Sequence, residues 1–264
     1  MVSTERDDRG AAAVAATEFP AEVAAIRERF GDLPIIMAGM VGSTIGWRSV
    51  PYLPTPARLD DLATGLDWID DRTAIVPGVS DSGDQGADVM RGEEVQLLGA
   101  CLAGLAPDDA LLCQPGTHCK WALMADGAIV RFTTAMTGEL FAMLKAHSLL
   151  SSQFGGPVQV GPAFLTGVAE GARRDLAASL FSIRARGLLG QLDDEDAASF
   201  ASGVLIGADV AARITNGDRV HILADEQLCA LYGAAVGALG GDAVIIDSHA
   251  AFVAGISRVW ELAQ

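Results

Sequence analysis

The sequence predicts an α/β fold in which helices cover a sheet. Half of the 264 residues are hydrophobic and 30 are glycine, which is typical of a packed α/β enzyme. Strand-like apolar runs and a hairpin signal alternate along the chain with segments of helical periodicity. This alternation indicates layered α/β architecture, and the length suffices for one large or two modest domains.

The boundaries of these elements follow from apolar spacing and from glycine and proline. The first helix begins after Pro20, where a helix tolerates proline, and stops before Gly31. An Ala-Asp-Gly turn between residues 121–124 and 128–133 predicts a hairpin. The Gly- and Asp-rich residues 80–88 predict an exposed loop and a hinge. In chain order, the predicted elements are helix 21–30, strands 33–37 and 73–76, helix 93–105, strands 110–113, 121–124 and 128–133, helices 139–147, 163–173 and 195–213, strand 220–223, helix 226–239, strand 243–246 and helix 250–262.

Charge and cysteine usage exclude several classes of protein. The net charge of −16 and the scattered basic residues argue against a nucleic-acid partner. The chain has no apolar run of membrane-spanning length, and residues 1–10 do not resemble a signal peptide. Its four cysteines form no CxxC pair, which argues against a zinc site. We therefore expect a cytoplasmic protein with reduced cysteines and no membrane contact.

A glycine-rich segment, AGMVGSTIGW at residues 38–47, follows the predicted strand 33–37. Glycines at a strand end allow a ligand to approach the backbone closely, because open α/β sheets bind ligands beyond their strand ends. Trp47 and Tyr52 are suited to contact the apolar face of a sugar, and Ser43 is suited to bond its hydroxyls. A structural loop with aromatic anchors is the alternative.

The segment MRGEE places two carboxylates at a predicted helix start. Glu93 or Glu94 is suited to act as general base toward a substrate hydroxyl, and Arg91 to hold a carboxylate or phosphate. Two acidic residues in a first helical turn also complement the helix dipole, so a structural role is the alternative.

The segment PGTHCKW combines a strand, a Gly-Thr turn and a lysine. The turn at Gly116 and Thr117, with His118 and Lys120 beside it, suits a phosphate, although no Walker motif is present. His118 and Cys119 suggest a thiol hydrolase only weakly, since adjacent residues on a strand point to opposite faces.

Further polar residues follow predicted strands. The pair Thr137-Gly138 precedes a predicted helix and is interpreted as a cap. Asp225 and Asp247 stand at strand ends, where a helix cap and a ligand contact are both reasonable.

Taken together, AGMVGSTIGW, MRGEE, PGTHCKW, MTGEL and SGVLIGADV resemble the motif series of 2-dehydro-3-deoxygalactonate kinases, in the order of that family. The resemblance implies an α/β fold of two actin/ribonuclease-H-like domains around a cleft that binds ATP. It implies ATP and Mg²⁺ as cofactors, with no metal ligand assigned to a residue. The implied reaction is transfer of the γ-phosphoryl group to the 6-hydroxyl of 2-dehydro-3-deoxy-D-galactonate in galactonate catabolism.

The resemblance also implies roles for individual residues. Glu94, with Glu93 as its neighbour, is the expected general base, assisted by Arg91. The expected phosphate contacts come from the turn of Gly116 and Thr117, with His118 and Lys120 beside it. The adenosine is expected near Ala224, Asp225 and the residues up to Leu228, together with the helix end at Gly207-Ala208-Asp209. The sugar-acid contacts are expected from Gly39, Met40, Gly42, Ser43, Trp47 and Tyr52.

The sequence departs from the family pattern at its start. No Asp-Trp-Gly type turn precedes Pro20, so we expect the first domain to lack its leading β-hairpin. An incomplete sugar-acid domain is expected at residues 1–84, a nucleotide domain at 85–249, and a C-terminal helix at 250–264 that packs on the first. A homodimer is compatible with this interpretation. The alternative is a truncated homologue that binds the sugar acid without efficient phosphoryl transfer.

Overall fold

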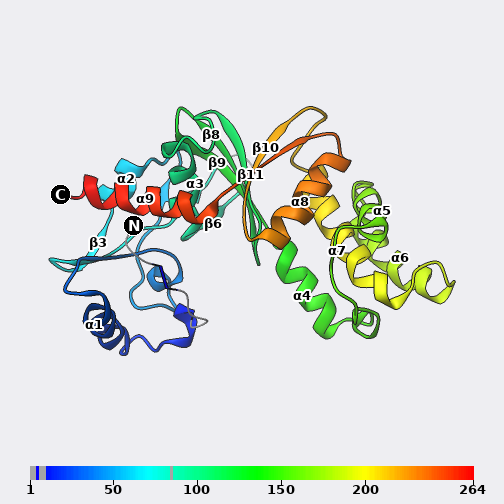
Figure 1. Cartoon of the computed structure of the whole chain (residues 1–264), viewed down its shortest axis with the longest axis horizontal. Coiled ribbons are helices and arrows are strands. Elements are labelled where there is room, and N and C mark those ends of the chain that lie inside the picture. Colours follow the sequence, from blue (N-terminus) through cyan, green and yellow to red (C-terminus); the bar gives the residue numbers. More distant parts are fainter. Residues whose placement is uncertain (1–3, 6–9, 84–85) are drawn as a thin grey trace. The chain divides into compact units, whose positions relative to one another are not determined.

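The computed structural model describes residues 4–5, 10–83 and 86–264, which divide into two units (Figure 1). Unit 1 comprises the described residues up to Asp109, together with Ala122–Phe132 and Ser248–Gln264. Unit 2 comprises Ala110–Trp121 and Thr133–Asp247. The expected domain boundary between residues 84 and 85 lies outside the described residues, as does much of the segment before residue 10. The expected cleft and missing hairpin stay predictions.

Unit 1 contains two small sheets with helices around them. One sheet has the order β1-β4-β3, in which β1 and β4 are parallel; the other has the order β2-β5-β6. The elements assigned entirely to this unit are α1 (Phe19–Phe30), β1 (Ile35–Met37), β2 (Leu53–Pro54), α2 (Leu59–Thr64), β3 (Asp67–Asp70), β4 (Thr73–Ile75), β5 (Val79–Asp81), β6 (Asp88–Met90), α3 (Glu93–Leu102) and α9 (Ser248–Leu262).

A five-stranded sheet of order β11-β10-β7-β8-β9 carries the helices of unit 2. Strand β10 pairs in parallel with both β11 and β7. The strands are β7 (Ala110–Gln114), β10 (Arg219–Leu223) and β11 (Asp242–Ile246), with β8 (Cys119–Ala125) and β9 (Ala128–Ala135), which contribute residues to both units. The helices are α4 (Thr137–His147), α5 (Pro162–Gly171), α6 (Leu176–Leu188), α7 (Asp194–Ala211) and α8 (Glu226–Ala238).

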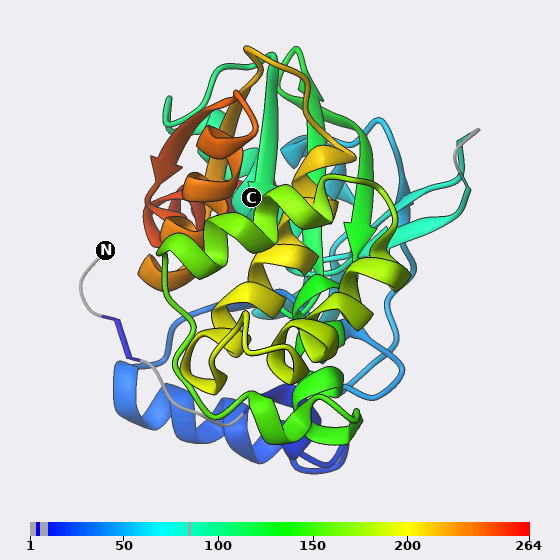
Figure 2. The ribbon, with the colours of Figure 1, turned by 90° about the vertical axis from the view of Figure 1, so that its right-hand side faces the viewer.

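Helices α5 and α7 pack side by side through glycines (Figure 2). A Cβ on Gly203 would lie 2.1 Å from the carbonyl oxygen of Phe164, and one on Gly167 would lie 2.2 Å from that of Phe200. Gly171 and Gly207, one turn further along each helix, show the same close approach. Side chains would hold these helices apart, so the glycines set the spacing in the core of unit 2.

Helices α3 and α9 of unit 1 also pack closely at glycines (Figure 1). A Cβ on Gly99 would lie 2.0 Å from the carbonyl oxygen of Ala251, and one on Gly255 would lie 2.1 Å from that of Val95. This crossing ties the C-terminal helix to the helix that begins at the MRGEE motif.

The predicted long elements are present with boundaries shifted by a few residues, and α/β architecture is confirmed. We expected an exposed loop at residues 80–88. This expectation is wrong for residues 80, 81 and 88, which belong to strands. Strands β5 and β6 pair antiparallel there, with β2 beside β5. The side chain of Asp81 is buried there. Its carboxylate accepts hydrogen bonds from the backbone N–H groups of Gly83 and Phe132, at 2.9 and 3.3 Å.

Replacing Gly203 by alanine is expected to lower the free energy of unfolding by about 1–3 kcal/mol, since the new methyl group overlaps the backbone of α5. Gly237→Ala in α8 is the matched control, because nothing lies within 4 Å of its Cβ position. The control should leave stability unchanged or raise it, as alanine favours helix. Urea unfolding measures both, and equal effects of the two substitutions would contradict the close helix crossing.

Candidate functional site

Two glycines from separate motifs meet in unit 1. Gly39, after β1, and Gly92, before α3, have positive φ angles of 92° and 108°. A Cβ on Gly92 would lie 2.9 Å from the Cα of Gly39. Only glycine allows this backbone contact, which brings the loop of residues 39–52 beside residues 91–94.

Arg91 is the charged centre of this contact. Its Nη2 donates to the carbonyl oxygen of Val50 at 2.6 Å, and its guanidinium lies 4.3 Å from the ring centre of Tyr52. A Cβ on Gly42 would lie 2.8 Å from its Nη1, so the glycine makes room for the guanidinium. Nε and Nη1 are buried with no acceptor among the described residues. Buried donors are normally satisfied, and a ligand carboxylate would supply the missing acceptors.

The two carboxyl groups of MRGEE differ in environment. Glu93 is partly exposed and accepts a hydrogen bond from the backbone N–H of Arg91 at 3.1 Å. Glu94 is fully buried, and both of its oxygens accept from the N–H of Gly92, at 2.8 and 2.7 Å. Burial raises the pKa of the Glu94 carboxyl to about 8, and the nearby charge of Glu93 adds to the effect.

Ser43 and Trp47 of the expected sugar-acid site have partners within unit 1. The hydroxyl of Ser43 donates to the carbonyl oxygen of Met40 at 2.7 Å and accepts from the N–H of Ile45 at 3.3 Å. Trp47 stacks on Phe19, with ring centres 5.6 Å apart. Trp47 therefore has a packing partner of its own, whereas Tyr52 contacts Arg91.

In unit 2, the turn between β7 and β8 lies against the first turn of α4. The N–H of Glu139 donates to the carbonyl oxygen of Thr117 at 2.9 Å, and a Cβ on Gly138 would lie 2.4 Å from that of Gly116. The backbone N–H groups of Gly116 and Thr117 have no hydrogen-bond partner among the described residues. Unpaired N–H groups beside a helix N-terminus are suited to bind an anion.

A mainly apolar cavity of about 180 Å³ adjoins this turn. The turn and the start of α4 form one part of its wall, and α7 and α8 form much of the rest. Its lining residues are Gly116, Thr137, Gly138, Phe141, Val158, Ser202, Leu205, Ile206, Gln227, Leu228, Leu231 and Tyr232. An apolar cavity that ends at polar backbone groups fits a ligand with a flat apolar part and an anionic part.

Other residues expected near the phosphate have side-chain partners in the protein. Lys120 is buried, and its Nζ donates to the hydroxyl of Thr134 at 2.9 Å. The ring Nε2 of His118 lies 2.6 Å from a carboxylate oxygen of Glu139. Cys119 is buried, and burial raises the pKa of its thiol. His118 and Cys119 thus make no catalytic pair, which removes the thiol-hydrolase alternative.

At the strand-to-helix turn before α8, one residue caps the helix and others line the cavity. The carboxylate of Asp225 accepts from the N–H of Leu228 at 2.9 Å and caps α8. Neither Ala224 nor Asp225 lines the cavity, whereas Gln227 and Leu228 do.

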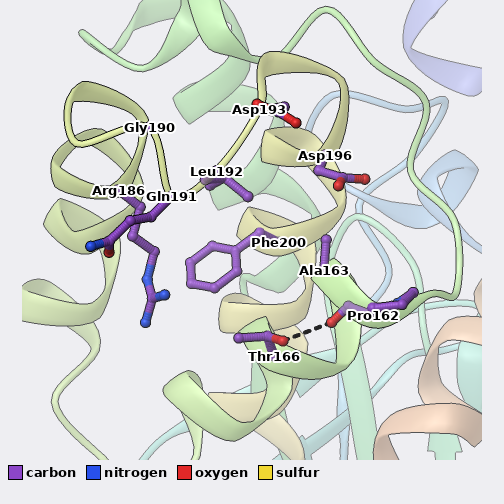
Figure 3. Close-up of a pocket in the computed structure, with 10 residues that line it drawn as sticks. All are labelled: Pro162, Ala163, Thr166, Arg186, Gly190, Gln191, Leu192, Asp193, Asp196 and Phe200. Carbon is purple, nitrogen blue, oxygen red and sulfur yellow. Dashed lines mark hydrogen bonds between the residues drawn. The ribbon is translucent and has the colours of Figure 1, made fainter.

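Figure 3 shows another cavity of unit 2, of about 260 Å³, among α5, α6 and α7. The Arg186 guanidinium lies 5.2 Å from the ring centre of Phe200, and the hydroxyl of Thr166 donates to the carbonyl oxygen of Pro162 at 2.8 Å. No residue of the expected site lines this cavity.

The model of the 2-keto-3-deoxy-galactonokinase family matches residues 1–259. The chain belongs to this family. It is 39% identical over 230 residues to the 2-dehydro-3-deoxygalactonokinase of Escherichia coli K12, covering 86% of this chain and 78% of the relative. A probable 2-dehydro-3-deoxygalactonokinase of Rhizobium meliloti is 36% identical over 245 residues, which cover 87% and 80% of the two chains.

A solved structure agrees with this assignment. The crystal structure of a protein assigned as a 2-dehydro-3-deoxygalactonokinase, from Sinorhizobium meliloti, superposes with a TM-score of 0.90 at 34% identity. The match covers 98% of this chain and 90% of that one. The family and the carbohydrate-kinase class predicted from the motifs are thereby confirmed. In the described part of the chain, no helix is both long and apolar enough to traverse a lipid bilayer.

Two residues of the candidate sites carry no distinctive signal in the sequence. Tyr232 lines the cavity, but a tyrosine in an apolar helical run gives no sign that it lies at a cavity wall. The carbonyl oxygen of Val50 holds Arg91, and a backbone acceptor leaves no signal in the sequence. Thr137 was interpreted as a cap, yet it too lines the cavity.

Glu94 should make stability depend on pH. The folded chain holds its proton up to about pH 8, whereas an unfolded chain releases it near 4.5, so this carboxyl lowers the free energy of unfolding as pH rises between these values. The slope is at most about 1.4 kcal/mol per pH unit. Glu94→Gln should flatten the decline measured by urea unfolding across this range. Glu28→Gln, on the exposed side of α1, should keep the parent slope, and an unchanged slope in Glu94→Gln would contradict the burial effect.

Proposed function

We propose that this chain transfers the γ-phosphoryl group of ATP to the 6-hydroxyl of 2-dehydro-3-deoxy-D-galactonate. The names of the curated relatives supply the substrate. The structural observation that supports phosphoryl transfer best is the mainly apolar cavity of unit 2, because one of its lining residues, Gly116, belongs to the turn that carries the N–H groups of Gly116 and Thr117. Phosphoryl transfer depends mainly on positioning and charge stabilisation, which such groups provide.

The nucleotide would occupy unit 2. Its base fits against the apolar side chains of the cavity, among them Leu228 and Leu231. Its phosphates would receive hydrogen bonds from the turn and from the first turn of α4, whose dipole favours negative charge. His118 and Lys120 would act near this turn without lining the cavity.

The sugar acid would occupy unit 1. Its carboxylate would bind Arg91, which is partly exposed and whose guanidinium has two nitrogens without acceptors among the described residues. The exposed face of Tyr52 and the backbone of residues 39–43 would contact its carbon chain and hydroxyls. Trp47 would support the loop from behind.

For the general base we propose Glu93, with Glu94 in support. The sequence favoured Glu94, but that carboxyl has no exposure and holds the N–H of Gly92. A base needs access to the hydroxyl that it deprotonates, and the partly exposed Glu93 has it.

Magnesium is expected to enter with the nucleotide. Within the described residues, no group of three or more His, Cys, Asp or Glu side chains converges as a metal site. Mg²⁺ commonly binds through substrate phosphates with few protein ligands, so we assign it to ATP. A homodimer and a cytoplasmic location stay predictions from the sequence.

The direct test supplies the full chain with ATP, Mg²⁺ and the sugar acid. ADP release should depend on the sugar acid, and NMR of the product should place the phosphate on carbon 6. Phosphate on another carbon would contradict the proposed position. Binding of the sugar acid without ADP release would instead support the alternative of a homologue that binds but does not transfer.

Paired glutamine substitutions identify the base. Glu93→Gln is expected to lower kcat by about 10²–10⁴-fold, as loss of a general base does. Glu94→Gln should retain most activity, because its amide oxygen still accepts from the N–H of Gly92. Steady-state kinetics measure kcat for both variants. A large loss in Glu94→Gln with little loss in Glu93→Gln would identify Glu94 as the general base.

Arg91→Lys is expected to raise the KM for the sugar acid by about tenfold or more, because lysine cannot bind a carboxylate in bidentate fashion or stack on Tyr52 in the same way. The KM for ATP should stay within about twofold of the parent value. Arg48→Lys is the control, since Arg48 is exposed and pairs only with Asp67 among the described residues. A matching rise in the control would refute the assignment.

A further inference from the structure

Three hydrogen-bond donors from three elements converge on the carboxylate of Asp209 in α7. The indole Nε1 of Trp121 lies 3.0 Å from Oδ1. The hydroxyls of Thr137 and Tyr232 lie 3.0 and 3.1 Å from Oδ2. The guanidinium Nε of Arg213 lies 4.0 Å from Oδ1. All of these residues belong to unit 2.

Asp209 stands behind the cavity rather than in it. Thr137 and Tyr232 line the cavity, and Asp209 does not. Its side chain is only 3% exposed, and burial raises its pKa while the three donors oppose that rise. Burying a carboxylate costs free energy, and an apolar residue would be sufficient if this position served only for packing. The carboxylate therefore indicates a need to orient its neighbours.

The orientation has a chemical consequence. A hydroxyl has one hydrogen to donate, and in Thr137 and Tyr232 that hydrogen is directed at Asp209. Toward any other neighbour, these two oxygens can act only as acceptors. The polar part of the wall is thereby suited to ligand groups that donate, such as the hydroxyls or the amino group of a nucleoside.

We propose that Asp209 is a positioning residue for the nucleotide, holding Thr137 and Tyr232 as hydrogen-bond acceptors toward the nucleoside. The inference rests on the proposed kinase function and extends it to a residue that does not touch the ligand. It assigns the SGVLIGADV motif two separate tasks. The glycines set the spacing of α5 and α7, and the aspartate sets the polarity of the cavity wall.

Asp209→Asn tests the proposal because its effect on the network can be deduced. The indole of Trp121 can only donate, so the amide oxygen of asparagine must face it. The amide nitrogen then faces Thr137 and Tyr232 and donates to them. The hydroxyl hydrogens of Thr137 and Tyr232 become free to turn toward the cavity. The two hydroxyls would then donate to a ligand instead of accepting from it, with little change in side-chain volume.

Calorimetric titration of the full chain with ADP and with a non-hydrolysable ATP analogue measures the result. Asp209→Asn should weaken nucleotide binding by about tenfold or more, as a lost buried hydrogen bond does. In steady-state kinetics the KM for ATP should rise, while the KM for the sugar acid stays within about twofold. A role limited to folding would not separate the two KM values in this way.

Ile183→Val provides a matched control. Ile183 is fully buried in α6 of the same unit, does not line the cavity, and its truncation lowers stability by a modest amount. It should leave nucleotide affinity unchanged. An Asp209→Asn chain that binds nucleotide within twofold of the parent would refute the proposal, and so would an equal loss in Ile183→Val.

Removal of the hydroxyls at an intact Asp209 gives a second measurement, should Asp209→Asn fold poorly. Thr137→Val with Tyr232→Phe should reproduce the loss of nucleotide affinity, and an unchanged affinity in this pair would refute action through the hydroxyls. Where Asp209→Asn folds, adding it to the pair should cause little further loss, and additive losses would refute the proposal. A parent chain that binds no nucleotide at all would refute the proposed function as well.

Discussion

Close backbone contact at glycine is the constraint on which this structure depends. Gly92 meets Gly39 in unit 1, Gly138 meets Gly116 in unit 2, and Gly203 meets the backbone of α5. Each of these glycines belongs to one of the five family motifs. Since a Cβ at these positions would overlap neighbouring atoms, the motifs bring segments together that are far apart in the chain, and the polar residues beside them meet as a result.

The buried ionisable groups depend on these contacts. Arg91 and Glu94 lie on either side of the Gly39–Gly92 contact, and each depends on backbone groups that the contact supplies, the carbonyl oxygen of Val50 and the N–H of Gly92. In unit 2, Asp209 receives donors from β8, α4 and α8. Burying an ionisable group is costly, and such groups cluster where a site needs fixed orientation.

The sequence predicted the long periodic elements and the family, because periodicity and motif spacing are local signals. It did not predict the pairing of β5 with β6, since those strands are three residues long and depend on a partner. It favoured Glu94 as a base because residue type alone does not reveal burial. It did not point to Tyr232, because the hydroxyl partner of Tyr232, Asp209, is 23 residues away in the chain.

Hydrogen–deuterium exchange of the full chain, with ADP or with the sugar acid, tests the central claim most directly, because it locates each ligand on the backbone. The account predicts that ADP slows exchange at residues 114–118, 137–140 and 227–232 of unit 2. It predicts that the sugar acid slows exchange at residues 39–52 and 91–94 of unit 1. The account would be contradicted if ADP slowed exchange at the unit 1 segments and left exchange at residues 114–118 unchanged.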